Sequence, residues 1–369
     1  MKPCKIACIF GTRPEVIKMA PVILALQSMP EQVRVEVIST GQHREMLIPL
    51  IKWFGLNVTK NMDLMHHNQR LNELTGRLVH QLGQCFNSSS YDLVIGQGDT
   101  TTVFAAALAA FHEQIPFAHV EAGLRTFDRN LPFPEEMNRV LVGRLANIHF
   151  APTTIAVQNL RKEGILEQNI FMTGNTVIDA LQYTVRRLQQ ENQTVILKEK
   201  TIFVTAHRRE NFGAPLKSIC RGIRRILEAF PEANFVFSVH PNPNVREVVY
   251  EILGDAPQVK LVEPMSYPEL VAYVQACYII LTDSGGLQEE APFLGKPVLI
   301  LREETERPEV VNLGGATLVG SDEENISHWV MKLLLNKEVY QKMVLGYSPY
   351  GDGAAGKQIA EKLVTLLKL

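Results

Sequence analysis

The Ser284-Gly285-Gly286 turn stands between an apolar run and a short predicted helix, within the stretch 283–292. The first turn of a helix has unpaired backbone N–H donors and a positive dipole end, so this turn predicts a phosphate site. Glu290, one turn into the helix, could accept hydrogen bonds from ribose hydroxyls, while Arg302 and Arg307 offer charge to a diphosphate. The pattern predicts a binding site for a ribose diphosphate. The structural alternative is that the stretch is only a glycine-containing turn with charged residues on the surface.

Three carboxylates lie where predicted strands end or predicted helices begin. Asp99 follows the strand at 93–95, Glu121 follows the strand at 117–120, and Glu135 opens a helix. As structural alternatives, Asp99 would cap a helix and Glu135 would complement a helix dipole. The ends of strands in α/β proteins are nevertheless where functional side chains gather.

Two cations, Arg13 and Lys18, lie at and just inside the start of the first predicted helix, where the helix dipole disfavours them. An anionic ligand bound at the helix start would resolve this conflict. The equally weighted alternative is that both cations are exposed and solvated by water. The turn before them has neither the G-x-G-x-x-G pattern of dinucleotide sites nor the G-K-[ST] of a Walker phosphate loop. The sequence predicts neither of those two sites.

Two series of alternating strands and helices carry these residues. In the first series, apolar runs predict strands at 5–10, 33–39, 93–95, 117–120, 148–151 and 170–172. After a polar stretch at 191–200, the second series has strands at 201–205, 235–239, 259–262, 278–281 and 297–301. The series predict an N-terminal domain at 1–173 and a C-terminal domain at 174–353, with helix 354–369 packing back on the first.

This alternation predicts an α/β protein with two doubly wound, Rossmann-like parallel sheets. Ligands of such folds bind beyond the carboxyl ends of the strands. Because polar residues concentrate there in both halves, we expect one cleft between two domains, with some of these residues as bystanders. The residues at strand ends are Arg13, Gln42, His43, Asp99, Glu121, His207, His240 and 283–286.

Composition narrows the function. A chain of 369 residues, 46% of them apolar, can bury two cores, and a formal charge of −2 argues against a nucleic-acid binder. Five scattered cysteines without a C-x-x-C pair indicate reduced thiols rather than a disulfide framework or a zinc site. No apolar run is long enough to span a membrane and Met1 leads directly into a strand, so we expect a cytoplasmic protein without a signal peptide.

Taken together, the motifs resemble the bacterial non-hydrolysing UDP-N-acetylglucosamine 2-epimerases. The matching runs cover essentially the whole chain in order: GTRPEVIKMAP from Gly11, TGQHREML from Thr40, GDTTT from Gly98, HVEAGLRT from His119, PEEMNR from Pro134, TGNTVIDAL from Thr173, TAHRREN from Thr205, HPNPNVRE from His240, LTDSGGLQEEAPFLGKPVL from Leu281, TERPE from Thr305 and SPYGDG from Ser348.

The resemblance implies a glycosyltransferase-B-like fold, a homodimer, and neither metal nor nicotinamide cofactor. It also implies reversible conversion of UDP-N-acetylglucosamine to UDP-N-acetylmannosamine for cell-envelope polysaccharide. No carbonyl flanks C2 of the sugar, so a carboxylate would remove the C2 proton while the C1–O bond breaks and UDP takes the electrons. The intermediate would be 2-acetamidoglucal with UDP, and a second group would reprotonate the opposite face.

The same resemblance assigns roles to individual residues. The catalytic set is Asp99, Glu121, Glu135 and His207, with Lys18 and Arg139 in support. UDP falls on Arg13, Ser284, Gly285 and Gly286, with Glu290 on the ribose and Arg307 near the leaving group. A regulatory UDP-N-acetylglucosamine site known in part of the family is matched by Gln42, His43, Gln69, Glu136, Arg208 and His240. The chain departs from the family at three residues. Gln97 bears on fine tuning of the site, Met265 bears on contacts with the base, and Asn68 bears on regulation.

Four other functions stay open at this point. They are a 2-epimerase for a modified UDP-sugar such as a diacetamido uronic acid, a hydrolysing epimerase, a UDP-sugar glycosyltransferase that needs an acceptor, and a UDP-sugar sensor without turnover. The sequence barely distinguishes the first from the main interpretation. The three carboxylates at strand and helix ends argue against the sensor.

Overall fold

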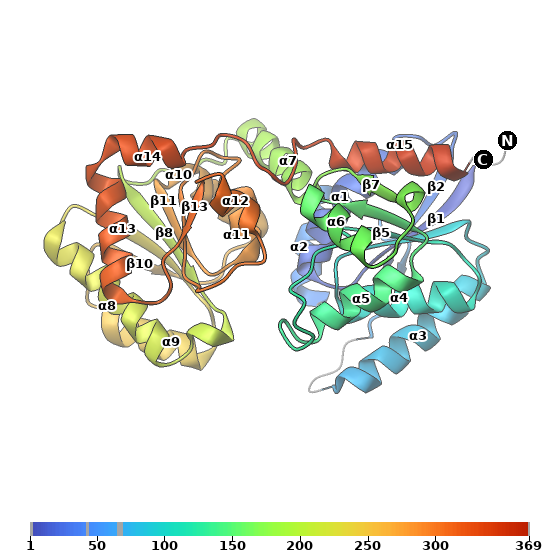
Figure 1. Cartoon of the computed structure of the whole chain (residues 1–369), viewed down its shortest axis with the longest axis horizontal. Helices are drawn as coiled ribbons and strands as arrows, with labels where there is room; N and C mark the ends of the chain where they lie inside the picture. Colours follow the sequence, from blue (N-terminus) through green and yellow to red (C-terminus); the bar gives the residue numbers. More distant parts are fainter. Residues whose placement is uncertain (1–2, 42–43, 65–68, 368–369) are drawn as a thin grey trace. The chain divides into compact units, whose positions relative to one another are not determined.

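The computed structural model describes residues 3–41, 44–64 and 69–367, and their contacts divide the chain into two compact units (Figure 1). Unit 1 contains Met1–Ala180 and Tyr350–Leu369, and unit 2 contains Leu181–Pro349. Helix α7 (Thr176–Gln190) therefore begins in unit 1 and ends in unit 2. Over these described ranges, no helix combines the length and the apolar character needed to pass through a bilayer.

Unit 1 is built on a parallel sheet that, within the described residues, has seven strands in the order β3-β2-β1-β4-β5-β6-β7. The strands are β1 Cys4–Phe10, β2 Val33–Ser39, β3 Lys60–Asn61, β4 Leu93–Gln97, β5 Phe117–Val120, β6 Ile148–Ala151 and β7 Ile170–Met172. The helices are α1 Arg13–Gln27, α2 Arg44–Phe54, α3 Leu71–Asn87, α4 Thr101–His112, α5 Glu135–Leu145, α6 Thr154–Lys162 and α15 Ala355–Leu367.

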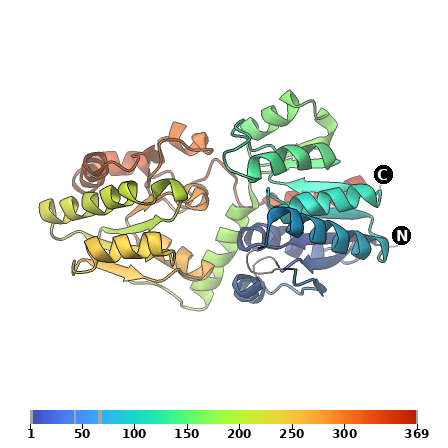
Figure 2. The ribbon, with the colours of Figure 1, turned by 90° about the horizontal axis from the view of Figure 1, so that it is seen from below.

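Helices cover both faces of this sheet, which is why its central strands are continuous apolar runs rather than alternating ones. Helices α1, α2 and α15 pack together on one face, and α3, α4 and α5 pack together on the other (Figures 1 and 2). The alanines of α4 at 105–107, 109 and 110 are all buried in the core of this second face. Their small side chains let the helix lie close to the sheet.

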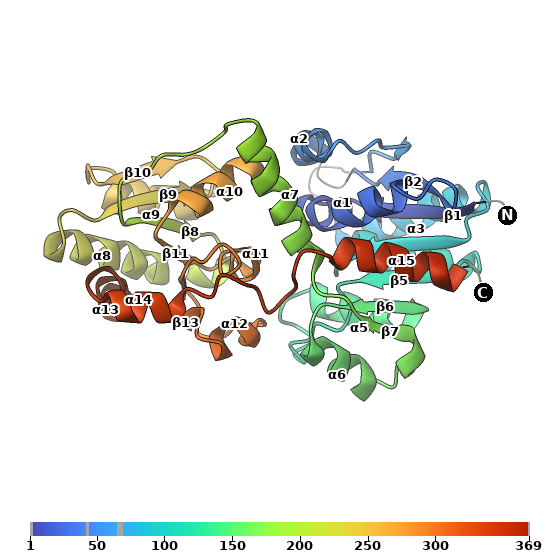
Figure 3. The same ribbon diagram turned by 90° about the horizontal axis from the view of Figure 1, so that it is seen from above.

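The last helix returns the chain to unit 1, where α15 lies along α1 (Figure 3). Gly356 permits this approach, because a Cβ there would lie 2.8 Å from the carbonyl carbon of Pro21. The connection before α15 is bound to the start of α7, since Asn175 N donates to the carbonyl of Tyr350 at 2.5 Å. The C-terminal segment thus belongs structurally to the N-terminal sheet.

Unit 2 has a second parallel sheet, six strands within the described chain, in the order β10-β9-β8-β11-β12-β13. The strands are β8 Thr201–Ala206, β9 Asn234–Val239, β10 Val259–Val262, β11 Ile279–Thr282, β12 Val298–Ile300 and β13 Ala316–Leu318. The helices are α8 Ala214–Ala229, α9 Pro243–Leu253, α10 Tyr267–Ala276, α11 Gly285–Glu290, α12 Pro308–Asn312, α13 Glu323–Leu335 and α14 Lys337–Met343.

The core of unit 2 lies between its sheet and helices α8, α9 and α13. The amphipathic helix α8 buries Ile219, Ile223 and Ile226 in a core cluster that also contains residues of β8 and β11. On the opposite face, Tyr273 of α10 contacts Phe203 of β8 with ring centroids 6.1 Å apart. The prediction of two doubly wound parallel sheets is confirmed.

Each sheet has a point where the strand order reverses direction. In unit 1 this switch point lies between β1 and β4, and in unit 2 it lies between β8 and β11. Loops that leave neighbouring strands at a switch point diverge to opposite faces and open a crevice, which is where ligands bind in such sheets. The loops in question begin at Gly11, Gly98, His207 and Asp283.

Several predicted elements differ from the observed ones. The sequence did not predict β3, β13, α12 or α14, which have two, three, five and seven residues. Elements this short bury too few side chains to show a periodic pattern. The short helix predicted after the Ser-Gly-Gly turn is α11, which ends at Glu290, and the next residues form turns ahead of β12.

Asp179 of α7 ties that helix to the first turn of α15. Its Oδ1 accepts from Gly356 N at 2.8 Å, while Oδ2 is buried and has no hydrogen-bond partner among the described residues. Burial raises the pKa of Asp179 to about 6, although the N–H groups of Gly356 and Ala355 oppose the shift. The folded chain therefore holds a proton here more tightly than the unfolded chain does.

We expect Asp179→Asn to stabilise the protein at pH 7.5 by about 1–3 kcal/mol. A raised folded-state pKa gives stability that is present below about pH 4 and is lost as the pH rises through about 6, and the neutral amide escapes this loss. Urea unfolding at pH 4 and pH 7.5 measures the effect, with Glu361→Gln on the exposed side of α15 as control. A variant less stable than the parent at pH 7.5 would contradict the prediction.

Candidate functional site

The first βα turn of unit 1 is held by a buried carboxylate. Glu15 Oε2 accepts from the backbone N–H of Gly11 at 2.8 Å and of Thr12 at 2.6 Å, and Oε1 accepts from Thr100 Oγ1 at 2.5 Å. Burial raises the pKa of Glu15 in spite of these donors. The N–H groups of the turn are thus bound by the protein itself, and Arg13 begins α1 directly after it. Sequence reasoning missed Glu15, although Thr12-x-x-Glu15 is the signature of a capping box.

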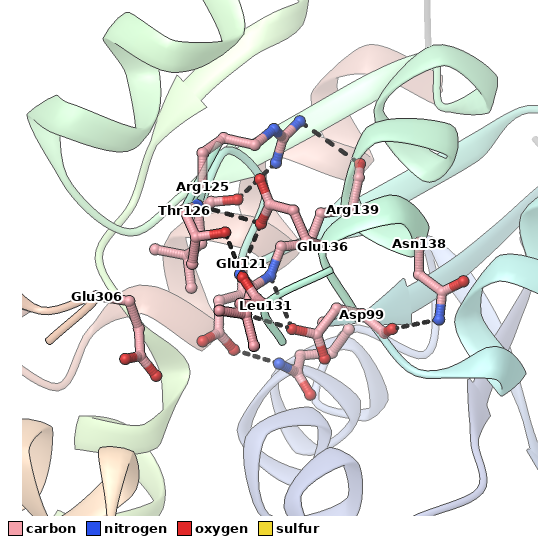
Figure 4. Close-up of polar contacts among 12 residues, drawn as sticks. Asp99, Glu121, Arg125, Thr126, Leu131, Glu136, Asn138, Arg139 and Glu306 are labelled. Atoms are coloured by element: carbon pink, nitrogen blue, oxygen red, sulfur yellow. Dashed lines mark hydrogen bonds and ion pairs between the residues drawn. The ribbon is translucent and has the colours of Figure 1, made fainter. Parts of the chain in front are cut away.

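Asp99, in the loop after β4, is held by the start of α5 (Figure 4). Its Oδ2 accepts from Arg139 Nε at 2.8 Å and also lies 2.8 Å from Arg139 Nη2. Asn138 Nδ2 donates to the Asp99 carbonyl at 2.8 Å. The Asp99 side chain is 26% exposed, so its carboxylate is oriented and still accessible to a ligand.

Arg139 is shared between two carboxylates. Its Nη1 donates to Glu136 Oε2 at 3.0 Å, and Glu136 also accepts from the N–H groups of Thr126 and Phe127 at 3.1 and 3.0 Å (Figure 4). Burial opposes the charge of Arg139, but Asp99 and Glu136 outweigh it and raise the pKa of the guanidinium. Glu136 is buried and connects α5 to the loop before it.

Glu121 follows β5 in a left-handed backbone conformation, with a φ of +63°. Residues other than glycine adopt this conformation at a cost, and it is found mostly where the surrounding structure requires it. Lys18 Nζ of α1 lies 2.7 Å from both Glu121 oxygens, and Gln97 Nε2 of β4 also donates to the carboxylate. The carboxylate is buried and aimed at the α1 side of the switch point.

His119 supports the same region from β5. Its Nε2 lies 2.7 Å from the Gly98 carbonyl, which precedes Asp99. Burial lowers the pKa of His119 to about 3, so the ring is neutral. This contact fixes the loop that carries Asp99, a role that the sequence did not reveal.

Glu135 is the first residue of α5 and is half-buried. Within the described part of the chain, no hydrogen bond or ion pair of its side chain is found. Unit 1 therefore pairs Asp99 with Arg139 and Glu121 with Lys18, while Glu135 lies at the helix start beside Glu136.

The switch point of unit 2 is organised by Asp283. This fully buried side chain accepts at Oδ2 from the N–H groups of His207 and Arg208 at 2.8 and 2.9 Å, and from Asn211 Nδ2 at 2.9 Å. Its Oδ1 lies 3.2 Å from His207 Nδ1. Burial lowers the pKa of His207, with Asp283 opposing the shift and Arg208 and His240 adding to it.

The Ser-Gly-Gly turn packs against Arg307. A Cβ on Gly285 would lie 2.6 Å from Arg307 Nη1 and 2.8 Å from Cζ, so the guanidinium rests on the glycine. Arg307 Nε donates to Glu289 at 2.6 Å and Nη1 donates to Glu306 at 2.6 Å. Ser284 is the N-cap of the six-residue α11 and donates its backbone N–H to Thr282 Oγ1 at 2.9 Å.

Arg302 is bound by two carboxylates. It donates to Glu210 and Glu306, each at 2.7 Å. Burial alone would raise the pKa of Glu306, but Arg307 and Arg302 hold it well below its usual range. Both arginines expected at a diphosphate therefore already have carboxylate partners that the sequence did not reveal, Glu210 and Glu306 for Arg302 and Glu289 and Glu306 for Arg307.

The expected ribose ligand Glu290 is buried and accepts from the Tyr267 hydroxyl at 2.6 Å. Of the residues matched to a regulatory site, Gln42 and His43 lie outside the described residues. Gln69 accepts from Arg77, and the His240 ring stacks on the His207 ring with centroids 6.0 Å apart.

This combination defines a class of protein: an α/β chain of two Rossmann-like units, as in the glycosyltransferase-B-like enzymes, with paired carboxylates at one switch point and an Asp–His pair at the other. Among the described residues, no group of three or more His, Cys, Asp or Glu side chains is placed to hold a metal ion. The chain belongs to the UDP-N-acetylglucosamine 2-epimerase family, whose model matches residues 25–364. The predicted family is confirmed.

Named relatives agree with this placement. The UDP-N-acetylglucosamine 2-epimerase of Bacillus subtilis is 46% identical over 365 residues, which cover 99% of this chain and 96% of the relative. The UDP-GlcNAc 2-epimerase of Neisseria meningitidis, solved bound to UDP-GlcNAc, matches with a TM-score of 0.92 at 44% identity over 98% of this chain and 100% of that chain. The enzyme of Methanocaldococcus jannaschii, solved with UDP-GlcNAc and UDP, matches at 0.82 and 35% identity over 98% and 99%.

We expect Gly285→Ala to destabilise the ligand-free protein by about 1–3 kcal/mol, because its methyl group displaces an Arg307 guanidinium held by Glu289 and Glu306. Gly286→Ala is the matched control, since its Cβ would meet only ordinary contacts at 3.8 and 3.9 Å. Chemical denaturation of both variants measures the difference. Equal stability of the two would show that the guanidinium moves aside without cost.

Proposed function

We propose that this protein catalyses the reversible epimerisation at C2 of UDP-N-acetylglucosamine, which yields UDP-N-acetylmannosamine. The proposal rests on the membership of the chain in this family. The site agrees with it, because Asp99 and Glu121 are each held by a cation at the switch point of unit 1. A relative 44% identical to this chain was solved with UDP-GlcNAc bound.

The proposed reaction is an elimination followed by a re-addition. A base takes the C2 proton, the C2–H electrons form the C1=C2 double bond, and the C1–O bond breaks with its electron pair on UDP. The 2-acetamidoglucal then receives a proton at C2 from the opposite face while UDP oxygen attacks C1. Stabilising the charge on departing UDP lowers both barriers.

We assign the proton transfers to Asp99, Glu121, Glu135 and His207. The geometry of unit 1 supports this assignment, because Arg139 orients Asp99 and Lys18 orients Glu121, while Asp99 keeps an exposed edge. A reaction on two faces of a sugar ring needs more than one acid–base group.

We assign UDP to Arg13, Ser284, Gly285, Gly286, Glu290 and Arg307. Arg307 supports this assignment, since Glu289 holds its Nε, Glu306 holds its Nη1, and the guanidinium lies beside Gly285 of the Ser-Gly-Gly turn. A guanidinium fixed in this way is pre-oriented for phosphate oxygens. The assignment draws on both units, so we propose that residues 1–173 supply most acid–base groups and residues 174–353 bind UDP.

We further propose a homodimer that acts in the cytoplasm, and a second, regulatory UDP-N-acetylglucosamine site at Gln69, Glu136, Arg208 and His240 together with Gln42 and His43. Arg208 supports the second site, because its Nε is buried and has no hydrogen-bond partner among the described residues. All five cysteines, each within the described ranges, are free thiols, as suits a reducing compartment.

The central test uses UDP-N-acetylglucosamine as the sole substrate in deuterated water. We expect deuterium to enter at C2 and UDP-N-acetylmannosamine to appear, and we expect Asp99→Asn and Glu121→Gln to slow both by about 10²- to 10⁴-fold. Nuclear magnetic resonance of the sugar measures both outcomes. Glu73→Gln, the same chemical change at an exposed position of α3, is the control.

Other outcomes of this experiment identify other functions. Free N-acetylmannosamine in the product would indicate a hydrolysing enzyme. Turnover only after an acceptor is added would indicate a glycosyltransferase, and exchange only with a diacetamido uronic acid would indicate the modified-sugar epimerase. Binding with no exchange on any UDP-sugar would leave a sensor.

The regulatory site predicts a sigmoidal dependence of initial rate on UDP-N-acetylglucosamine concentration. We expect Arg208→Ala to make this dependence hyperbolic, because an allosteric ligand loses a charged partner. Arg209→Ala is the control, since Arg209 is the exposed neighbour. A hyperbolic curve for the unaltered protein would remove the regulatory proposal and leave the catalytic one intact.

A further inference from the structure

The two oxygens of Asp283 have different partners. Oδ2 accepts three hydrogen bonds, from the backbone N–H groups of His207 and Arg208 and from Asn211 Nδ2. Oδ1 has no hydrogen-bond partner among the described residues, and His207 Nδ1 lies 3.2 Å from it. The side chain is fully buried, so bulk solvent does not reach Oδ1.

A carboxylate with this environment decides which nitrogen of the facing imidazole carries the proton. Three donors already occupy Oδ2, and an ionised carboxylate can only accept hydrogen bonds. The proton of a neutral His207 ring is then favoured on Nδ1, the ring nitrogen that lies 3.2 Å from Oδ1. The other groups that face this ring are Arg208 from the same loop and His240 from the loop after β9, and neither offers a carboxylate.

We infer that Asp283 is a positioning residue that holds the proton of His207 on Nδ1, so that Nε2 is the nitrogen left to exchange a proton with the substrate. The side chain of His207 is 38% exposed, whereas that of Asp283 is fully buried. The carboxylate therefore faces Nδ1, and Nε2 is the ring nitrogen that does not face it. The catalytic part of this inference rests on the proposed function, whereas the tautomer does not.

Asp283→Asn tests the inference with little change of shape. The amide oxygen can take the place of Oδ2 and keep the three hydrogen bonds, which leaves the amide NH₂ facing His207 Nδ1 as a donor. The imidazole must then accept at Nδ1 and carry its proton on Nε2. The variant reverses the tautomer while it preserves the loop.

The measurement is ¹⁵N magnetic resonance of the histidine side chains at a pH above the pKa of the imidazole. The variant His207→Gln identifies the signal of His207, because that signal is missing from its spectrum. We expect Nδ1–H in the unaltered protein and Nε2–H in Asp283→Asn. We also expect kcat of Asp283→Asn to fall by about 10²- to 10⁴-fold, with KM little changed, because a proton-transfer group is presented in the wrong state.

Asn211→Ala is the matched control, because it removes one donor to Oδ2 and the bond to the Leu301 carbonyl but leaves Oδ1 and its charge in place. If Asp283→Asn and Asn211→Ala lost kcat equally, and if the His207 proton stayed on Nδ1 in Asp283→Asn, the role of Asp283 would be structural only. A His207 proton on Nε2 in the unaltered protein would overturn the inference without any activity measurement. Absence of C2 exchange in the unaltered protein, with the tautomer as expected, would instead count against the proposed function.

Discussion

A buried carboxylate that binds consecutive backbone N–H groups determines the switch point of each sheet. Glu15 does this for the turn after β1, and Asp283 does it for the loop after β8. Because an unpaired buried carboxylate and an unpaired buried N–H group are both costly, each loop has few alternatives to the observed conformation. The start of α1 and the orientation of His207 follow from these bonds. A proton-transfer site needs that rigidity, since a small misplacement of a reacting group costs much of the rate.

The second shared feature is local compensation of charge. Lys18 binds Glu121, Arg139 lies between Asp99 and Glu136, and Arg307 binds Glu289. This agrees with a chain of formal charge −2 that nevertheless contains strongly charged clusters. Groups held in this way are already oriented before a ligand arrives, so substrate binding does not have to supply the free energy for ordering them. The strained backbone at Glu121 fits the same pattern of local constraint.

Much of the fold was accessible from the order of residues. Strand β2 was predicted with its observed bounds, because Val33, Val35, Val37 and Ile38 are β-branched and the run 33–39 ends at the Thr40-Gly41 turn. The short elements β3 and α12 were not predicted, since they are stabilised by neighbours rather than by their own periodicity. The capping function of Glu15 could have been found from Thr12-x-x-Glu15, a signal local to one helix turn.

The sequence by itself determined the family, the two parallel sheets and the placement of candidate residues at strand ends, because these depend on local periodicity and on motifs read in order. Only the tertiary structure decided which groups meet. His207 and Asp283 are 76 positions apart and become partners because β8 and β11 are neighbours in the sheet. Arg302 is likewise 92 positions from Glu210, which compensates its charge. Such pairs depend on which strands lie side by side, and that order follows from the packing of the whole unit rather than from any single stretch of the chain.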